Sequence, residues 1–266
     1  MYRVHAEPSK EKLFALGEFL ATLDLQLPAK GSGALRPAAF NRILAAAKDL
    51  PVPDLVNEVV LRAQSQAEYA PENYGHFGLN LRRYAHFTSP IRRYADLLVH
   101  RSLIRALGFG GDGLTDDEAG RMKDIARHIS ETERRAMAAE RETVDRLIAT
   151  FLADRVGAEF DARISGVSRS GLFVRLRETG ADGFVPASSL GSDYFRHHEA
   201  THSLIGDRSG EGYHLGDKLQ VRLVEAIPAA GALRFEMLSE GRKSHAVLRK
   251  GGRFISKPLR DRRRRR

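Results

Sequence analysis

The sequence predicts an α+β chain with a helix-rich first part, a small five-stranded β-barrel and a disordered basic tail. Apolar residues recur at helical spacing up to about residue 154, and they alternate with polar residues in short runs after Gly157. Lys and Arg accumulate after residue 241. A chain of 266 residues is long enough to bury two separate cores. We therefore expect three parts, at 1–155, 156–241 and 242–266.

Proline and capping residues mark the expected helix starts in the first part. The starts are Pro8-Ser9, Pro37, Pro53-Asp54, Ser89-Pro90 and the capping box Thr115-Asp116-Asp117-Glu118, and the helices are expected at 9–23, 37–48, 53–66, 90–107 and 116–154. The last helix exceeds ordinary length, so we expect a break inside it. The segment 67–88 is expected to be irregular, with one short strand at 77–81.

Strand-like alternation dominates the second part. Five short runs alternate apolar and polar residues and are separated by glycine turns or a longer interval, at 160–164, 172–176, 184–186, 218–226 and 232–238. Five short strands over so few residues are typical of a small barrel of the OB type. A polar interval at 191–216 separates the third run from the fourth, and we expect it to be a solvated loop.

The polar interval holds a histidine group that invites a metal interpretation. His197, His198 and His202 have a spacing that a zinc site could use. The chain has no cysteine, however, and these histidines do not lie on an expected helix. Solvated loop histidines are therefore the better explanation, and we expect no metal site in this chain.

The net charge of +9 is concentrated at the carboxyl end. Residues 242–266 hold twelve Lys or Arg and one acid, a net charge of +11, whereas the remaining residues carry a net charge of −2. Such a tail is expected to be disordered and to bind polyanions without sequence preference. RNA is the preferred partner, although an acidic protein, a membrane surface or a merely solubilising terminus would also explain the composition.

Secretion and membrane insertion are not expected. The amino terminus lacks an apolar leader segment, and no run approaches about 18 apolar residues. The absence of cysteine rules out disulfides and fits a reducing compartment. We therefore expect a cytoplasmic protein.

The segment 76–101 is the candidate functional site. It reads HFGLNLRRYAHFTSPIRRYADLLVHR and places aromatic residues beside paired arginines at an expected helix start. Arg92 and Arg93 would lie in the first helical turn, where the unpaired backbone N–H groups already attract anions. Solvated or carboxylate-paired arginines and buried rings are the alternative explanation. Side chains that can stack on RNA bases here include His86, Phe87 and Tyr94.

Two stretches resemble a known enzyme family. The motifs NYGHFGL and YAHFTSPIRRYADLLVHR resemble the distal part of the catalytic domain of the RNB family of exoribonucleases, which includes ribonuclease II. The motifs AEFDARISGV, GLFVRL and GADGFVPASSL are similar to the S1-type RNA-binding domain that follows it. The resemblance covers essentially the whole chain, and it implies the carboxyl-terminal portion of a larger enzyme.

The resemblance implies a processive enzyme that hydrolyses single-stranded or structured RNA from the 3′ end and releases nucleoside 5′-monophosphates. By motif, Arg92 in SPIRRY would contact the scissile phosphate and neutralise its developing charge. Glu140 in MAAER matches the glutamate near the end of the RNA channel. Arg93 and Tyr94 would contact RNA beside Arg92.

The resemblance also implies magnesium, which is held by aspartates in a segment like GxDAxDxDDA in the proximal half of the RNB domain. This chain contains no such segment, and Asp116-Asp117-Glu118 is better explained as a helix start. Hydrolysis by this route needs a divalent ion to activate water. We therefore expect no hydrolysis by the chain alone, and an upstream fragment or a protein that carries the aspartates would restore it.

The expected barrel carries its own candidate RNA contacts. Phe173 matches the stacking position of S1-type domains, whereas Val185-Pro186-Ala187-Ser188 stands where many of them read VHIS, so a histidine contact is missing. Four arginines would bind phosphates or simply form solvated strand faces: Arg163, Arg169, Arg175 and Arg177. Three interpretations of the chain stay open, namely a portion of an exoribonuclease, a noncatalytic RNA-binding or chaperone module, and a nonfunctional remnant.

Overall fold

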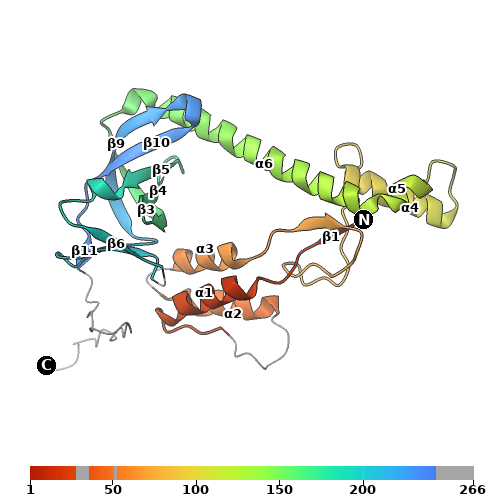
Figure 1. The fold of residues 1–266 in the computed structure, drawn as a ribbon, viewed down its shortest axis with the longest axis horizontal. Helices are drawn as coiled ribbons and strands as arrows, with labels where there is room; N and C mark the ends of the chain where they lie inside the picture. Colours follow the sequence, from red (N-terminus) through yellow and green to blue (C-terminus); the bar gives the residue numbers. More distant parts are fainter. Residues whose placement is uncertain (28–35, 51–52, 200, 244–266) are drawn as a thin grey trace. The chain divides into compact units, whose positions relative to one another are not determined.

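The fold is known from a computed structural model, which describes residues 1–27, 36–50, 53–199 and 201–243 (Figure 1). The chain divides into two compact units, the first from Met1 to Val144 and the second from Asp145 onwards. The basic tail expected at 242–266 lies outside the described residues from 244 on. Its first two residues form a short strand, β11 (Arg242–Lys243), and are not part of a disordered tail.

Three helices of the first unit confirm the expected ones. They are α1 (Lys10–Ala21), α2 (Pro37–Ala46) and α3 (Pro53–Ala63), and α3 packs against both of the others. The Ser9 side chain accepts the N–H of Lys12, which caps α1 as expected. Their buried faces carry apolar side chains, which explains why helical spacing predicts them: Leu16, Phe19, Leu20, Phe40, Ile43, Val56, Val59 and Val60.

A two-stranded sheet of the first unit is not predicted by alternation. β1 (Tyr2–Val4) pairs in antiparallel fashion with β2 (Glu68–Ala70), and each strand has only three residues. The strand expected at 77–81 is wrong. Residues 77–80 form a tight turn because the backbones of His76 and Leu81 exchange hydrogen bonds of 2.8 and 3.2 Å across it.

The remaining helices of the first unit differ from expectation at their starts. α4 (Tyr94–Leu107) begins at Tyr94 and not at Pro90, and it ends at Gly108 in a left-handed conformation. The long helical region is broken at Arg121 into α5 (Asp116–Gly120) and α6 (Met122–Leu152), as its length predicts. The capping box of Thr115 and Glu118 is confirmed. Within the described ranges, no helix combines the length and the apolar character that a bilayer span requires.

The second unit contains a closed barrel of five strands in the order β10–β5–β4–β3–β9. All five expected strands are confirmed, as β3 (Glu159–Ser168), β4 (Gly171–Leu176), β5 (Asp182–Pro186), β9 (Lys218–Ile227) and β10 (Ala232–Met237). Fully buried side chains fill the interior, among them Ile164, Leu172, Val174, Leu223 and Phe235. At Gly183 a Cβ would lie 2.1 Å from the ring of Phe235, so only glycine fits there.

The polar interval at 191–216 is not a solvated loop, and that prediction is wrong. It forms a second sheet of β6 (Phe195–His198), β7 (Ser203–Gly206) and β8 (Glu211–His214), to which β11 adds a fourth strand. One face buries Phe195, Leu204 and Tyr213. The apolar residues of these four-residue strands are too few to give an alternation that stands out in the sequence.

Candidate nucleic-acid interface

The segment 87–93, which we call the strap, runs along the first turns of α4. The imidazole Nε2–H of His100 donates to the carbonyl of Phe87 at 2.8 Å, and the N–H of Ser89 donates to the carboxylate of Asp96 at 2.8 Å. Asp96 and His100 are four residues apart on α4, so both lie on the same face of the helix. The strap is therefore pinned at two points, one helical turn apart.

A closed turn at the end of the strap presents Arg92 to solvent. The carbonyl of Ser89 accepts the N–H groups of Arg92 and Arg93 at 3.2 and 3.0 Å. Ile91 at the tip is fully exposed, and the exposed side chain of Arg92 makes no hydrogen bond or ion pair with a described residue. A guanidinium without a partner in this part of the chain is available to a phosphate.

This turn explains why the expected helix start at Pro90 is wrong. Asp96 captures the N–H of Ser89 from the first turn of α4, so the chain closes on itself before the helix begins. Arg93 has an extended backbone and precedes the helix without a side-chain cap. Arg92 and Arg93 therefore lie before the first helical turn and not inside it.

Asp96 is the buried centre of this arrangement. One carboxylate oxygen accepts from both Ser89 and the guanidinium of Arg93, the latter at 2.9 Å. Burial of Asp96 acts to raise its pKa, but these hydrogen bonds and the charge of Arg93 outweigh burial and hold the pKa below its usual value. Its second oxygen and the Arg93 Nε are buried without a partner among the described residues. Arg93 is thus engaged inside the protein, and its expected contact with RNA stays a prediction.

His86 is also engaged inside the first unit. Its Nδ1 lies 2.9 Å from the hydroxyl of Tyr69, and its ring meets the rings of Tyr69 and Tyr84 edge-on. Burial lowers the pKa of His86, and the nearby charges of Arg93 and Arg3 lower it further. An imidazole packed edge-on against two tyrosines is a structural side chain here, and base stacking by His86 stays a prediction.

Phe87 and Tyr94 are the more accessible aromatic residues at the strap. The ring of Phe87 stacks on His100 with centroids 4.1 Å apart and an angle of 12°, yet 46% of the residue is exposed. Tyr94 is 44% exposed at the first position of α4. One face of the Phe87 ring is therefore covered by an imidazole, while much of the residue stays open to solvent.

Glu140 lies in the second half of α6 and is exposed. No hydrogen bond or ion pair joins it to another residue in the described ranges. The structure therefore does not bring Glu140 into contact with the strap, and its expected role stays a prediction.

The outer face of the barrel combines two phenylalanines with a glycine. Phe173 on β4 pairs in register with Gly166 on β3 and with Phe184 on β5, and the two rings are 5.3 Å apart. A Cβ at Gly166 would lie 3.1 Å from the Phe173 ring, so the glycine lets that ring lie close to the sheet. Phe173 is 48% exposed. Phe184 is not among the contacts predicted from the sequence, although its alternation with buried Val185 indicates that it faces outward.

A row of cations lies beside these rings on the same outer face. Arg163 on β3 pairs in register with Arg175 on β4 and with Lys218 on β9. Arg175 forms a two-pronged ion pair with Asp182, with both N–O distances 2.8 Å. Arg169 is exposed in the turn between β3 and β4. Aromatic rings that can stack on bases, next to cations that can bind phosphates, are typical of surfaces that bind single-stranded nucleic acid.

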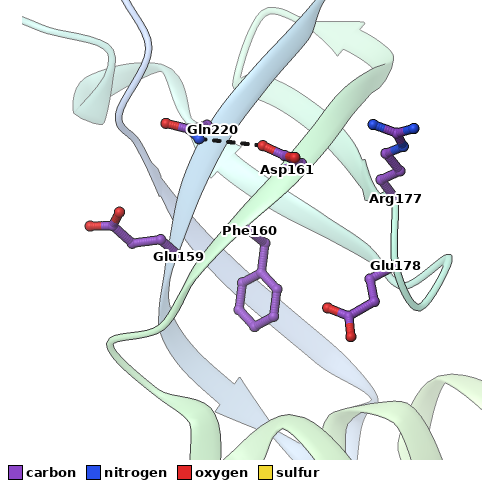
Figure 2. Close-up of a pocket in the computed structure, with 6 residues that line it drawn as sticks. All are labelled: Glu159, Phe160, Asp161, Arg177, Glu178 and Gln220. Carbon is purple, nitrogen blue, oxygen red and sulfur yellow. Dashed lines mark hydrogen bonds between the residues drawn. The ribbon is translucent and has the colours of Figure 1, made fainter.

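The opposite end of this face is acidic. A depression of about 560 Å³ is lined by six residues, Glu159, Phe160, Asp161, Arg177, Glu178 and Gln220, whose side chains are drawn in Figure 2. The Gln220 amide donates to Asp161 at 3.3 Å. Arg177 therefore shares its surroundings with three carboxylates, which weaken the attraction of phosphate to its guanidinium. Phosphate binding by Arg177 stays a prediction.

The described residues do not fit a magnesium site. No group of three or more His, Asp or Glu side chains in these ranges is arranged to hold a metal ion. His197 and His198 lie on β6, and His202 follows in a turn with φ of 43°. The divalent ion implied by the family resemblance therefore has no ligand set in this part of the chain.

Comparison with known domain families divides the chain in two. Residues 1–108 match the RNB domain, and residues 153–237 match the S1 RNA binding domain. The strap lies within the first match, and the barrel lies within the second.

Individual relatives match along most of the chain. The chain is 41% identical over 235 residues to ribonuclease R of Escherichia coli K12, covering 85% of this chain and 28% of that protein. It is 37% identical over 247 residues to ribonuclease R of Aquifex aeolicus, covering 93% and 35%. The structure of apo RNase R of Mycoplasma genitalium matches with a TM-score of 0.80 and 30% identity, over 89% of this chain and 37% of that one. The same protein in complex with ribose-methylated single-stranded RNA matches equally well, with a TM-score of 0.80.

Proposed function

Because this chain belongs to the RNB family of ribonucleases and joins part of an RNB domain to an S1 domain, we propose that it is the carboxyl-terminal portion of a ribonuclease R-type 3′-to-5′ exoribonuclease. The observation that carries the proposal is the exposed Arg92, which has no partner among the described residues and is held out by a closed turn. The aromatic and cationic face of the barrel supports a second RNA contact.

The chain spans about a third of the length of the relatives that it matches. Hydrolysis is therefore proposed for a complete assembly and not for this chain alone. The described residues provide no metal-ligand cluster, and phosphodiester hydrolysis by this family's route requires a divalent ion, which we propose to be magnesium. An upstream fragment or a separate protein would supply the aspartates that bind it.

In that assembly Arg92 would neutralise charge that develops on the phosphate under attack. Glu140 would influence how tightly the RNA end is held. The barrel would bind the strand before it reaches the site, through Phe173 and the cation row that contains Arg163 and Arg175. We also propose that the protein acts in the cytoplasm.

A noncatalytic RNA-binding or chaperone module is the second candidate. The complete five-stranded barrel favours it, because a closed barrel with an exposed ring, here Phe173, binds single strands without needing a metal ion. In this case the strap would contact RNA without taking part in hydrolysis.

One experiment separates the two candidates. A 20-nucleotide single-stranded RNA, labelled at the 5′ end or at the 3′ end, is incubated with magnesium and the chain, alone or with an RNB fragment that carries the aspartates. We expect binding without cleavage by the chain alone, and release of 5′-monophosphates from the 3′ end in the mixture. Arg92→Ala should lower the mixture's cleavage rate about 100-fold. The matched control Arg127→Ala removes an exposed guanidinium on α6 and should leave the rate unchanged.

The possible results have distinct meanings. Cleavage by the chain alone would contradict the proposed need for a second component. Protection of RNA with no cleavage in any mixture would favour the noncatalytic module. A mixture that retains full activity with Arg92→Ala would refute the role of Arg92.

A further inference from the structure

His100 makes two contacts with Phe87 that neither the motif nor the proposed reaction explains. Its ring stacks on the phenyl ring at 4.1 Å, and its Nε2–H donates to the carbonyl of the same residue at 2.8 Å. Together they fix both the backbone and the ring of Phe87 against α4. The stacked ring is the contact that restricts the plane of the Phe87 ring.

Much of Phe87 stays open to solvent. The residue is 46% exposed although the imidazole covers one of its faces. An aromatic ring that is backed by a second ring and open on its other side can accept a planar base at little entropic cost, because its rotamer is already fixed. The strap also carries Arg92, an unpaired cation within the described structure, five residues further along.

We propose that His100 is a positioning residue that holds Phe87 as a stacking platform for one unpaired RNA base. The phosphate of the bound nucleotide segment would be met by Arg92, which the second pin at Asp96 holds in its turn. The proposal rests on the proposed function, since it names a subsite for the same single-stranded ligand. His100 acts through Phe87 and does not itself touch the RNA.

The test measures base stacking directly. A five-nucleotide oligouridylate carries one 2-aminopurine at each position in turn, because stacking on an aromatic side chain quenches this fluorescent base. The parent protein is the full chain with Phe173→Ala, so that the barrel ring does not contribute. We expect quenching at one position, and Phe87→Ala should remove it.

Three substitutions of His100 distinguish the effect of the stacked ring from the effect of the hydrogen bond to Phe87. His100→Ala should lower the quenching by at least half and weaken binding about fivefold. His100→Phe keeps a ring behind Phe87 and should retain both values within twofold. His100→Gln keeps an N–H donor without the ring and should behave as His100→Ala. The matched control His128→Ala removes an exposed histidine on α6 and should change neither value.

The outcomes separate this inference from the proposed function. Unchanged quenching in His100→Ala would overturn the inference, as would loss in His100→Phe with retention in His100→Gln. Loss in all three variants would also overturn it, because the ring-preserving variant should rescue. Failure of the unaltered chain to bind any RNA would overturn the proposed function itself.

Discussion

The buried carboxylate of Asp96 accepts the backbone N–H of Ser89 at 2.8 Å. This one hydrogen bond joins the first turn of α4 to the strap that precedes it. The segment before α4 therefore closes as a turn, and it carries the exposed Arg92. We therefore expect this contact to stabilise the first unit and also to hold Arg92 in the position from which it would bind RNA.

Replacing Asp96 should destabilise the first unit strongly. Asp96→Ala leaves the guanidinium of Arg93 and the N–H of Ser89 without their acceptor, and loss of one partner of a buried ion pair costs about 3 kcal/mol. Asp96→Asn retains an acceptor oxygen and should cost less. Hydrogen exchange of the α4 amides during urea unfolding measures the difference. The exposed Asp124 pairs with Arg127, so Asp124→Asn should change stability by less than about 0.5 kcal/mol. Equal effects at both aspartates would contradict the buried role of Asp96.

Acidification below neutral pH should weaken the first unit through His86. The pKa of His86 is lowered from 6.5 in the folded state, so the unfolded chain takes up the proton first as the pH falls. The contribution of His86 to the free energy of unfolding is fully present above pH 6.5 and is lost as the pH falls through the lowered pKa. The thermal midpoint of the first unit should therefore fall between pH 7.5 and 5.5. His86→Gln should reduce this fall, and His128→Gln should not. A wild-type thermal midpoint that rises as the pH is lowered from 7.5 to 5.5 would contradict the role of His86.

Removing the rings of the barrel face should weaken RNA binding through the second unit. Stacking contributes about 1–3 kcal/mol per base, so Phe173→Ala should raise the Kd for a single-stranded oligonucleotide roughly 5- to 150-fold. Phe184→Ala should have a smaller effect, because Phe184 is less exposed and supports Phe173 from the side. Fluorescence anisotropy measures both. Phe151→Ala removes an exposed ring on α6 that lies under Arg155, and it serves as the matched control. A larger effect at Phe151 than at Phe173 would place the RNA elsewhere.

Deleting residues 244–266 should make RNA binding less dependent on salt. The deletion removes ten of the twelve Lys and Arg residues beyond position 241 and leaves β11 in place. Each phosphate contact adds about 0.7 to the slope of log K against log salt concentration for a single strand. The deletion should therefore reduce the magnitude of this slope by several times about 0.7. A tail of equal length with Gln in place of Lys and Arg should behave like the deletion, whereas an unchanged slope would exclude the tail as the electrostatic contact.

The sequence predicts the barrel strands because they bury every second residue. Leu172, Val174 and Leu176 face the interior while Phe173 and Arg175 face outward, so alternation alone locates β4. The strands β6 to β8 are only four residues long and carry histidine, glycine and arginine at many positions. Their pairing depends on neighbours far along the chain, which local alternation does not record.

The candidate site was predictable in composition and not in geometry. The motif around Arg92 and Phe87 identifies the segment, but the S-P pair also predicts a helix start that does not occur. The hydrogen bond that the Ser89 N–H donates to Asp96 prevents a helix start at Pro90, and the preference of Ser and Pro for helix starts takes no account of that contact. Asp96 is the one acidic residue in the segment 76–101, and its position among arginines was the available signal.

Closure of the barrel depends on β9 and β10, which leave the ribosome well after the other three barrel strands. β3 pairs with β9 although the strands β6 to β8 lie between them in the sequence. β10 closes the barrel by pairing in parallel with β5. During synthesis, the edge of β3 must therefore stay unpaired until β9 has emerged, and the edge of β5 until β10 has emerged. Such edges invite pairing with other nascent chains. A stalled or prematurely terminated translation product should consequently be cleared or aggregate.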